Sequence, residues 1–184
     1  MLHPTREEIA TVAAGCFWGV ELAFQRIPGV LRTSVGYAGG HAGPSSYRAV
    51  STGRTGHAEA VQITFDPDVV TYEELLDVLW ERHDATTKNR QGPDVGTQYR
   101  SVIFFHSEAQ RATAEASLAA HQRRLDTHHR QTGGRARTVV TEIVAADGGT
   151  DMAYHDAEDY HQQYLEKGGQ SAEKGETARI SCYG

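Results

Sequence analysis

The order in which strand and helix patterns follow one another limits the fold of this chain most strongly. Over the first 105 residues, some segments have the composition of strands and others have apolar residues at a 3.6-residue, helical period. They follow one another in the order strand, helix, strand, strand, helix, strand. This is the split β-α-β-β-α-β order of ferredoxin-like α+β sandwiches. We therefore expect a two-layer sandwich, with an extra strand, extra helices and a coil tail added after the core.

The predicted strands are residues 8–14, 30–37, 58–65, 101–105 and 137–144. The first helix starts at Cys16 and stops at Pro28-Gly29, and the second follows a capping box formed by Thr71 and Glu74. A polar, solvated helix is expected over 107–130 and a short one over 156–166. The polar stretch 82–96 is long for a connection, which is typical of functional loops.

The chain has 184 residues, about one domain's worth, without an internal repeat or a linker in the first 165 residues. We predict a single domain, 1–184, with a folded core over 1–166. Residues 167–184 hold many glycines and small polar residues, so this C-terminal tail is expected to be mobile.

Charge and cysteine content exclude several classes of protein. Eighteen Lys and Arg against 24 Asp and Glu give a net charge of −6, which argues against nucleic acid as a partner. No apolar run approaches the roughly 18 residues of a membrane span, and charges in the first 15 residues do not fit a signal peptide. Two cysteines are too few for a disulfide scaffold, so we expect a cytoplasmic protein with reduced thiols.

Cys16 lies where a strand of small residues turns into a helix. Unpaired N–H groups and the positive end of the helix dipole face its sulfur there, which favours the reactive thiolate. The alternative is a buried, inert cysteine. Phe17 and Trp18 follow directly and can wall an apolar pocket beside the sulfur, although plain core packing would also explain them.

Cys182 lies in the glycine-rich tail. The chain from Glu166 to Cys182 can span roughly 50 Å, so the tail is long enough to reach a distant site. A mobile thiol that reaches disulfide distance of a reactive one can act as a resolving cysteine. The alternative is a stray thiol near a disordered end.

Four further residues are candidates for polar chemistry. Glu59 shares a strand face with Val61, so burial of that face would raise the carboxyl pKa and keep it protonated. The alternative is a solvent-facing glutamate at a strand end. Tyr47 and Tyr99 border polar loops and can present their O–H groups, and Asp94 lies in a turn that turn chemistry alone could explain.

Ten histidines raise a metal hypothesis. His155, Glu158 and His161 fall three apart on the predicted helix, which is a weak ligand pattern, so we expect neither a metal nor another cofactor. A His-rich metal-binding module and a cysteine hydrolase using Cys16 with a histidine such as His57 or His83 remain alternatives. The hydrolase gives the second cysteine no role.

Five segments carry a resemblance to a known family, and they cover most of the chain. They are Gly15-Cys16-Phe17-Trp18-Gly19, Gly36-Tyr37-Ala38-Gly39-Gly40, Thr55-Gly56-His57-Ala58-Glu59, Asn89-Arg90-Gln91-Gly92-Pro93-Asp94-Val95-Gly96-Thr97-Gln98-Tyr99-Arg100-Ser101 and Ala157-Glu158-Asp159-Tyr160-His161-Gln162-Gln163-Tyr164. In this order they resemble the peptide methionine sulfoxide reductase A family, which reduces one epimer of methionine sulfoxide.

The resemblance implies a role for each candidate. The residue matching Cys16 attacks the sulfoxide sulfur, and those matching Phe17 and Trp18 hold the ε-methyl group. Positions matching Tyr47, Tyr99 and Glu59 bind the sulfoxide oxygen, with the glutamic acid as proton donor, and Asp94 matches a supporting position. A tail thiol then resolves the sulfenic acid, and thioredoxin reduces the disulfide. Substrates would be free methionine-S-sulfoxide and proteins containing it, and we expect a monomer.

Two departures from the family pattern stand out. Ala85 follows His83-Asp84 where the family usually has proline, which affects loop stiffness. Glu176 stands about where some members carry a first tail cysteine. Cys182 must therefore resolve Cys16 directly if any tail thiol does.

Overall fold

A computed structural model describes residues 6–41, 43, 45–148 and 153–182. Its elements are β1 (Glu8–Ala14), α1 (Phe17–Gln25), β2 (Val30–Ala38), α2 (Tyr47–Val50), β3 (Ala58–Phe65), α3 (Tyr72–Arg82), β4 (Arg90–Gln91), β5 (Asp94–Val95), η1 (Thr97–Tyr99), β6 (Ser101–Phe105), α4 (Glu108–Thr132), β7 (Glu142–Ala145), β8 (His155–Asp156), η2 (Asp159–His161) and α5 (Tyr164–Lys167).

The main sheet has the strand order β7-β6-β1-β3-β2-β8. Its four central strands pair antiparallel, and β7 adds to β6 in parallel while β8 adds to β2 at the opposite edge. The sequence order strand, helix, strand, strand, helix, strand therefore gives the expected split sandwich, and the α+β fold class is confirmed.

The period-two pattern of the strands decides which face is buried under the helices. On β3, Val61, Ile63 and Phe65 belong to the large core, where they join apolar residues of α1 and α3. Ala58 and Ala60 point to the other face and join a smaller cluster with Phe104. Glu59 therefore lies on the helix-covered face, as its alternation with Val61 predicts.

Helix ends agree with their local signals. The Thr71 side chain accepts a hydrogen bond from the Glu74 N–H, and the Glu74 carboxylate accepts from the Thr71 N–H, which completes the predicted capping box.

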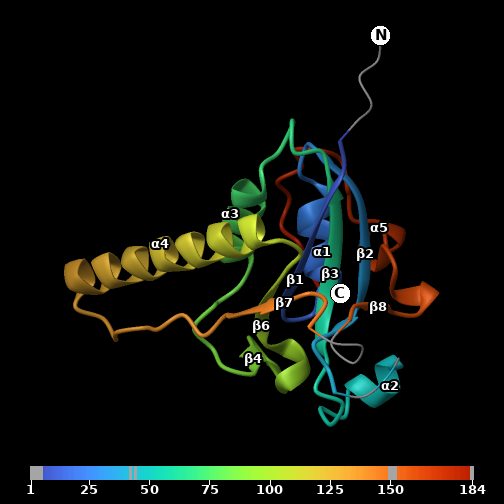
Figure 1. The fold of residues 1–184 in the computed structure, drawn as a ribbon, viewed down its shortest axis with the longest axis horizontal. Helices are drawn as coiled ribbons and strands as arrows, with labels where there is room; N and C mark the ends of the chain where they lie inside the picture. The colour runs from blue at the N-terminus through green and yellow to red at the C-terminus, as the bar shows by residue number, and fades with distance from the viewer. Residues whose placement is uncertain (1–5, 42, 44, 149–152, 183–184) are drawn as a thin grey trace.

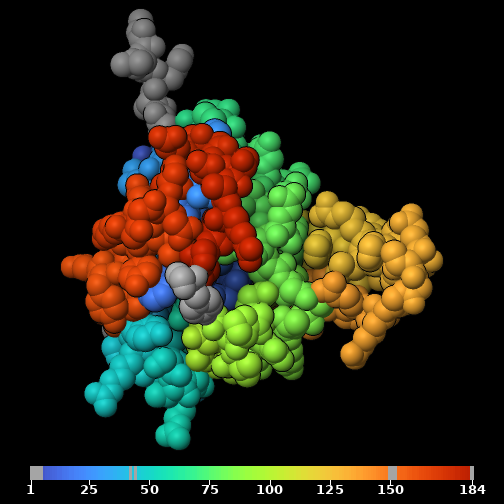
Figure 2. All heavy atoms as spheres, turned by 180° about the vertical axis from the view of Figure 1, so that it is seen from behind, coloured from blue at the N-terminus to red at the C-terminus, as the bar shows by residue number. Residues whose placement is uncertain are grey.

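The helix α4 projects from the rest of the molecule, at its side in both views (Figure 1, Figure 2). Gly133 ends it in the left-handed conformation. No described helix is long and apolar enough to cross a membrane.

The helix expected over 156–166 is wrong, because tertiary hydrogen bonds break that segment into three short pieces. The Gln162 side chain bonds both the N–H and the carbonyl of Val35, so it extends the sheet edge beside β8. The next residue, Gln163, takes a φ of +49°, which ends any continuous helix there. The strand expected at 137–144 forms only from Glu142 onward, where β6 provides its partners.

The local patterns also missed elements within the loops. A short helix, α2, follows the N-cap Ser46, and the stretch 82–96 contains the paired strands β4 and β5. Both are too short to show a period in the sequence.

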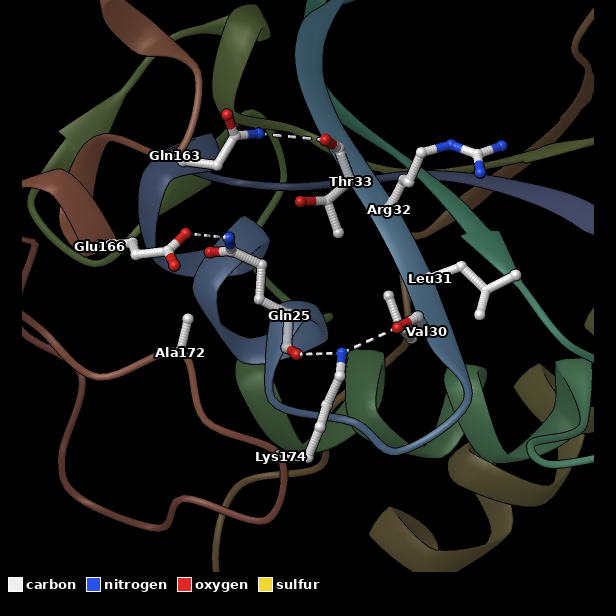
Figure 3. A pocket seen from close by; sticks show the side chains of 9 residues that line it. All are labelled: Gln25, Val30, Leu31, Arg32, Thr33, Gln163, Glu166, Ala172 and Lys174. Carbon is white, nitrogen blue, oxygen red and sulfur yellow. Dashed lines mark hydrogen bonds between the residues drawn. The ribbon is translucent and has the colours of Figure 1, made fainter.

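The C-terminal tail, from Gly168 to Cys182, contains turns but no helix or strand, and it passes over α1. Figure 2 shows this red part of the chain on one face of the molecule. The Lys174 ammonium donates to the carbonyls of Gln25 and Val30 at 2.6 and 2.8 Å, as Figure 3 shows. Arg26 donates to the carbonyls of Ser171 and Ala178. The mobility expected of this tail stays a prediction, and its last two residues lie outside the described residues.

Candidate active site

Cys16 is the N-cap of α1 and follows β1 with one intervening residue. That residue, Gly15, has a φ of +88°, and a Cβ on it would lie 2.7 Å from the Gln91 side chain. Only glycine fits this turn, which aims the sulfur at the start of the helix. The backbone N–H of Trp18 acts to lower the pKa of this thiol, as expected of a helix N-terminus.

Glu59 lies beside the start of the same helix. Its Oε2 accepts a hydrogen bond from the Phe17 N–H at 3.1 Å, and only 3% of the residue is exposed. Burial raises the pKa of this carboxyl to about 8, with a further contribution from the charge of Asp94, while the Phe17 N–H opposes the shift. The group is therefore mostly protonated at neutral pH and can give up a proton.

Tyr47 and Tyr99, the first residue of α2 and the last of η1, bring two phenols to this site. Burial raises the pKa of both, and negative charge on Glu59 or Cys16 raises it further. Both phenols therefore keep their protons and act as donors. Asp94, on β5, is near enough for its charge to act on Glu59 and on both phenols.

The two aromatic residues after Cys16 differ in environment. Phe17 is 1% exposed and packs against the Tyr37 ring at 5.9 Å, so it forms the inner wall. Trp18 is half-buried and stacks on the Tyr164 ring at 3.9 Å. Its indole N–H donates to His161 Nδ1 at 3.1 Å, so His161 and Tyr164 set the orientation of Trp18.

His161, which bonds the Trp18 indole, belongs to the histidine pattern that raised the metal hypothesis. His155 lies on β8, so it does not share a helix with Glu158 and His161, and that premise of the metal hypothesis is wrong. The Glu158 carboxylate accepts hydrogen bonds from the Tyr37 hydroxyl and the Tyr47 N–H. Among the described residues, no cluster of three His, Cys, Asp or Glu side chains could hold a metal ion.

The tail brings Cys182 to Cys16, and both thiols are free. The Cys16 thiol and the Gly19 N–H both act on the Cys182 sulfur, and the Arg82 Nη2 donates to it at 3.7 Å. These donors lower the pKa of Cys182 to about 6 despite burial. Contact with Cys182, burial and the charge of Glu59 together raise the pKa of Cys16.

This charge distribution differs from the one expected from the helix start alone. With the tail in place, Cys182 is the more acidic of the two thiols, because the Cys16 thiol and then the charge of Arg82 stabilise its thiolate. A cavity of about 190 Å³ opens beside the two sulfurs and is lined also by Asp94. A larger hollow of about 410 Å³ lies elsewhere, between β2, α5 and the tail, and Figure 3 shows polar side chains bonding across it.

A nucleophilic thiol at a helix start, a buried neutral acid and a second thiol in contact define a cysteine-dependent oxidoreductase acting on sulfur, on a split β-α-β sandwich. The chain belongs to the peptide methionine sulfoxide reductase family, whose model matches residues 8–181. The resemblance inferred from the sequence motifs is thereby confirmed.

Individual relatives agree over nearly the full length. The chain is 55% identical to peptide methionine sulfoxide reductase MsrA of Methanothermobacter thermautotrophicus over 167 residues, which is 91% of each protein. It is 49% identical to the peptide methionine sulfoxide reductase of Fragaria ananassa, covering 96% of this chain and 88% of the relative. The solved methionine sulfoxide reductase A of Corynebacterium diphtheriae matches with a TM-score of 0.78 at 36% identity, covering 98% of this chain and 83% of the other.

Proposed function

We propose that this chain is a thioredoxin-recycled reductase of methionine-S-sulfoxide, both free and within proteins. The observation that carries the proposal is the buried carboxyl of Glu59, bonded to the Phe17 N–H beside the helix start that holds the Cys16 sulfur. Burial raises the pKa of this carboxyl to about 8, which keeps it protonated at neutral pH. Relatives of about 50% identity are named peptide methionine sulfoxide reductases, which supports the reaction class.

In the first step, the Cys16 thiol gives its proton to the neighbouring Cys182 thiolate, and the resulting Cys16 thiolate attacks the sulfur of the sulfoxide. A sulfoxide oxygen is a poor leaving group until it is protonated, and Glu59 supplies that proton. The protonated oxygen then passes from the substrate sulfur to the Cys16 sulfur. The substrate S–O bond and the transient bond between the two sulfurs break, methionine leaves, and Cys16 is left as a sulfenic acid. Atoms and charge balance, because the thiolate, the sulfoxide and one proton give the sulfenic acid and the thioether.

Neighbouring groups position the substrate for this step. Tyr47 and Tyr99 donate hydrogen bonds to the sulfoxide oxygen, and Asp94 supports the pocket. Trp18 and Phe17 hold the ε-methyl group on an apolar surface that excludes water. These roles follow the match to the family and agree with the raised pKa of both phenols and the half-buried position of Trp18.

In the second step, Cys182 attacks the sulfenic acid of Cys16, and water leaves as the disulfide forms. The contact between the two sulfurs supports direct resolution by Cys182, although Glu176 replaces a cysteine found in some relatives. Thioredoxin, a dithiol protein, then reduces the disulfide by exchange. We also propose that the enzyme is a cytoplasmic monomer, because this cycle needs both thiols reduced and uses one chain.

Two substitutions test the cycle. Cys16→Ser should abolish methionine release, and Cys182→Ser should release one methionine per enzyme and then stop with thioredoxin as reductant. Repeated turnover by the Cys182→Ser protein with thioredoxin would remove the resolving role.

The alternative, a cysteine hydrolase, is disfavoured by the position of its base. His83 uses its two ring nitrogens on the Leu79 carbonyl and the Ser101 hydroxyl, both at 2.7 Å. His57 is buried and its Nδ1 lies 3.4 Å from the Ser45 hydroxyl. Mass spectrometry after treatment with methionine sulfoxide separates the two hypotheses. A disulfide between Cys16 and Cys182 supports reduction, and an unchanged dithiol supports hydrolysis.

A further inference from the structure

Arg82, the last residue of α3, connects three segments at the site. Its Nε donates to the Gly19 carbonyl at 3.2 Å, and its Nη2 lies 3.7 Å from the Cys182 sulfur. The side chain is half-buried and lines the same small cavity as Cys16. The guanidinium is thus fixed on helix α1 and aimed at the tail thiol.

Gly19 makes this approach possible. A Cβ built on Gly19 would collide with both the Arg82 guanidinium and the Cys182 sulfur. Its backbone N–H, near the start of α1, favours the thiolate of Cys182, while the backbone N–H of Trp18 favours the thiolate of Cys16. The start of one helix therefore serves both thiols, and the absence of a side chain at Gly19 leaves room for the second.

The groups that face Cys182 have opposing effects on its charge. The Cys16 thiol, the Gly19 N–H and Arg82 favour the thiolate, whereas burial and the carboxylate of Asp94 oppose it. Once Cys16 has become a sulfenic acid, its S–H can no longer donate. Arg82 then supplies a full positive charge beside the sulfur that must attack.

We propose that Arg82 is a catalytic residue of the resolving step, which holds the Cys182 sulfur against Cys16 and stabilises it as the thiolate. The inference rests on the proposed resolving role of Cys182. The thiolate attacks the sulfenic sulfur of Cys16, the S–S bond forms and the S–O bond breaks. The departing hydroxide takes one proton, from Glu59 or solvent, and leaves as water.

The test is a rapid-mixing experiment with methionine-S-sulfoxide on the full-length wild type, Arg82→Met and Arg82→Lys. Methionine release reports the first step, and loss of free thiols reports the second. In the Arg82→Met protein, Cys16 sulfenic acid should accumulate, trapped by dimedone, while the disulfide forms several-fold more slowly near pH 6. Arg82→Lys, which keeps the charge, should recover part of that loss.

The pH profile distinguishes loss of a charge from a structural defect. If Arg82 lowers the thiol pKa by about one unit, the variant-to-wild-type ratio of disulfide rates should rise roughly fivefold between pH 6 and pH 9. A purely structural defect would lower the rate equally at every pH. Arg124→Met is the matched control, because Arg124 is exposed and its guanidinium lies 3.7 Å from Asp77 on the outer side of α3.

A second measurement does not depend on turnover. In a Cys16→Ser background, the pH dependence of Cys182 alkylation by iodoacetamide should shift upward when Arg82 becomes Met. Unchanged alkylation and disulfide profiles in Arg82→Met would overturn the role of Arg82. A wild-type protein that releases methionine but forms no Cys16–Cys182 disulfide would instead refute the resolving role of Cys182.

Discussion

Glu59→Gln removes the proton that the proposed chemistry requires while keeping an oxygen that accepts the Phe17 N–H. With a pKa of about 8, the carboxyl is about 90% protonated at pH 7 and about 10% protonated at pH 9. Loss of a general acid costs about 10²- to 10⁴-fold in rate. We expect a loss of that size at pH 7, and a ratio of wild-type to variant rate that falls about tenfold per pH unit above pH 8.

The same substitution lowers the rate but should raise the free energy of unfolding at neutral pH. The pKa of Glu59 rises from 4.5 to about 8 on folding, so its contribution to stability is fully present below pH 4.5 and is lost as pH rises through 8. For this nearly fully buried group the loss is about 3 kcal/mol at pH 7 relative to acid pH. Glu59→Gln should abolish that pH-dependent part, so the variant gains stability relative to wild type between pH 4.5 and 8.

The assay is methionine release in a single turnover, in a Cys182→Ser background so that one thiol remains at the site. Urea unfolding over the same pH range gives the free energy of unfolding. Glu21→Gln is the matched control, because Glu21 is also a buried carboxyl but bonds Thr33 and Gln163. A Glu59→Gln protein that releases methionine at the wild-type rate, and whose rate changes above pH 8 as that of the wild type does, would refute the reasoning.

Three further changes have defined outcomes. Trp18→Leu removes the indole that stacks on Tyr164, so KM for methionine sulfoxide should rise more than kcat falls in steady-state assays. Thr71→Ala removes the N-cap of α3 and should lower the free energy of unfolding by about 1 kcal/mol in urea titrations, without changing activity. Arg26→Met removes two hydrogen bonds to the tail, so limited proteolysis should cut near residue 175 faster than in Lys167→Met, a change at an exposed residue of α5.

The candidate site was largely accessible from the sequence where the chain itself carries the signal. Cys16 and Phe17 are adjacent, and Glu59 follows the alternation of its own strand, so both placements come from local geometry. Arg82 gave no such signal. Its importance depends on a tail sulfur one hundred residues away in the chain, and no periodicity or motif reports that contact.

The amino-acid sequence by itself determined the split order of strands and helices, the capping box at Thr71 and the strand-to-helix turn at Gly15, because each depends on neighbours within a few residues. Tertiary structure alone decided that the segment after His155 forms short pieces and no continuous helix. It also decided the hydrogen bond between Trp18 and His161 and the path of the tail. Those features depend on hydrogen bonds and burial between segments that are far apart in the chain but adjacent in the fold.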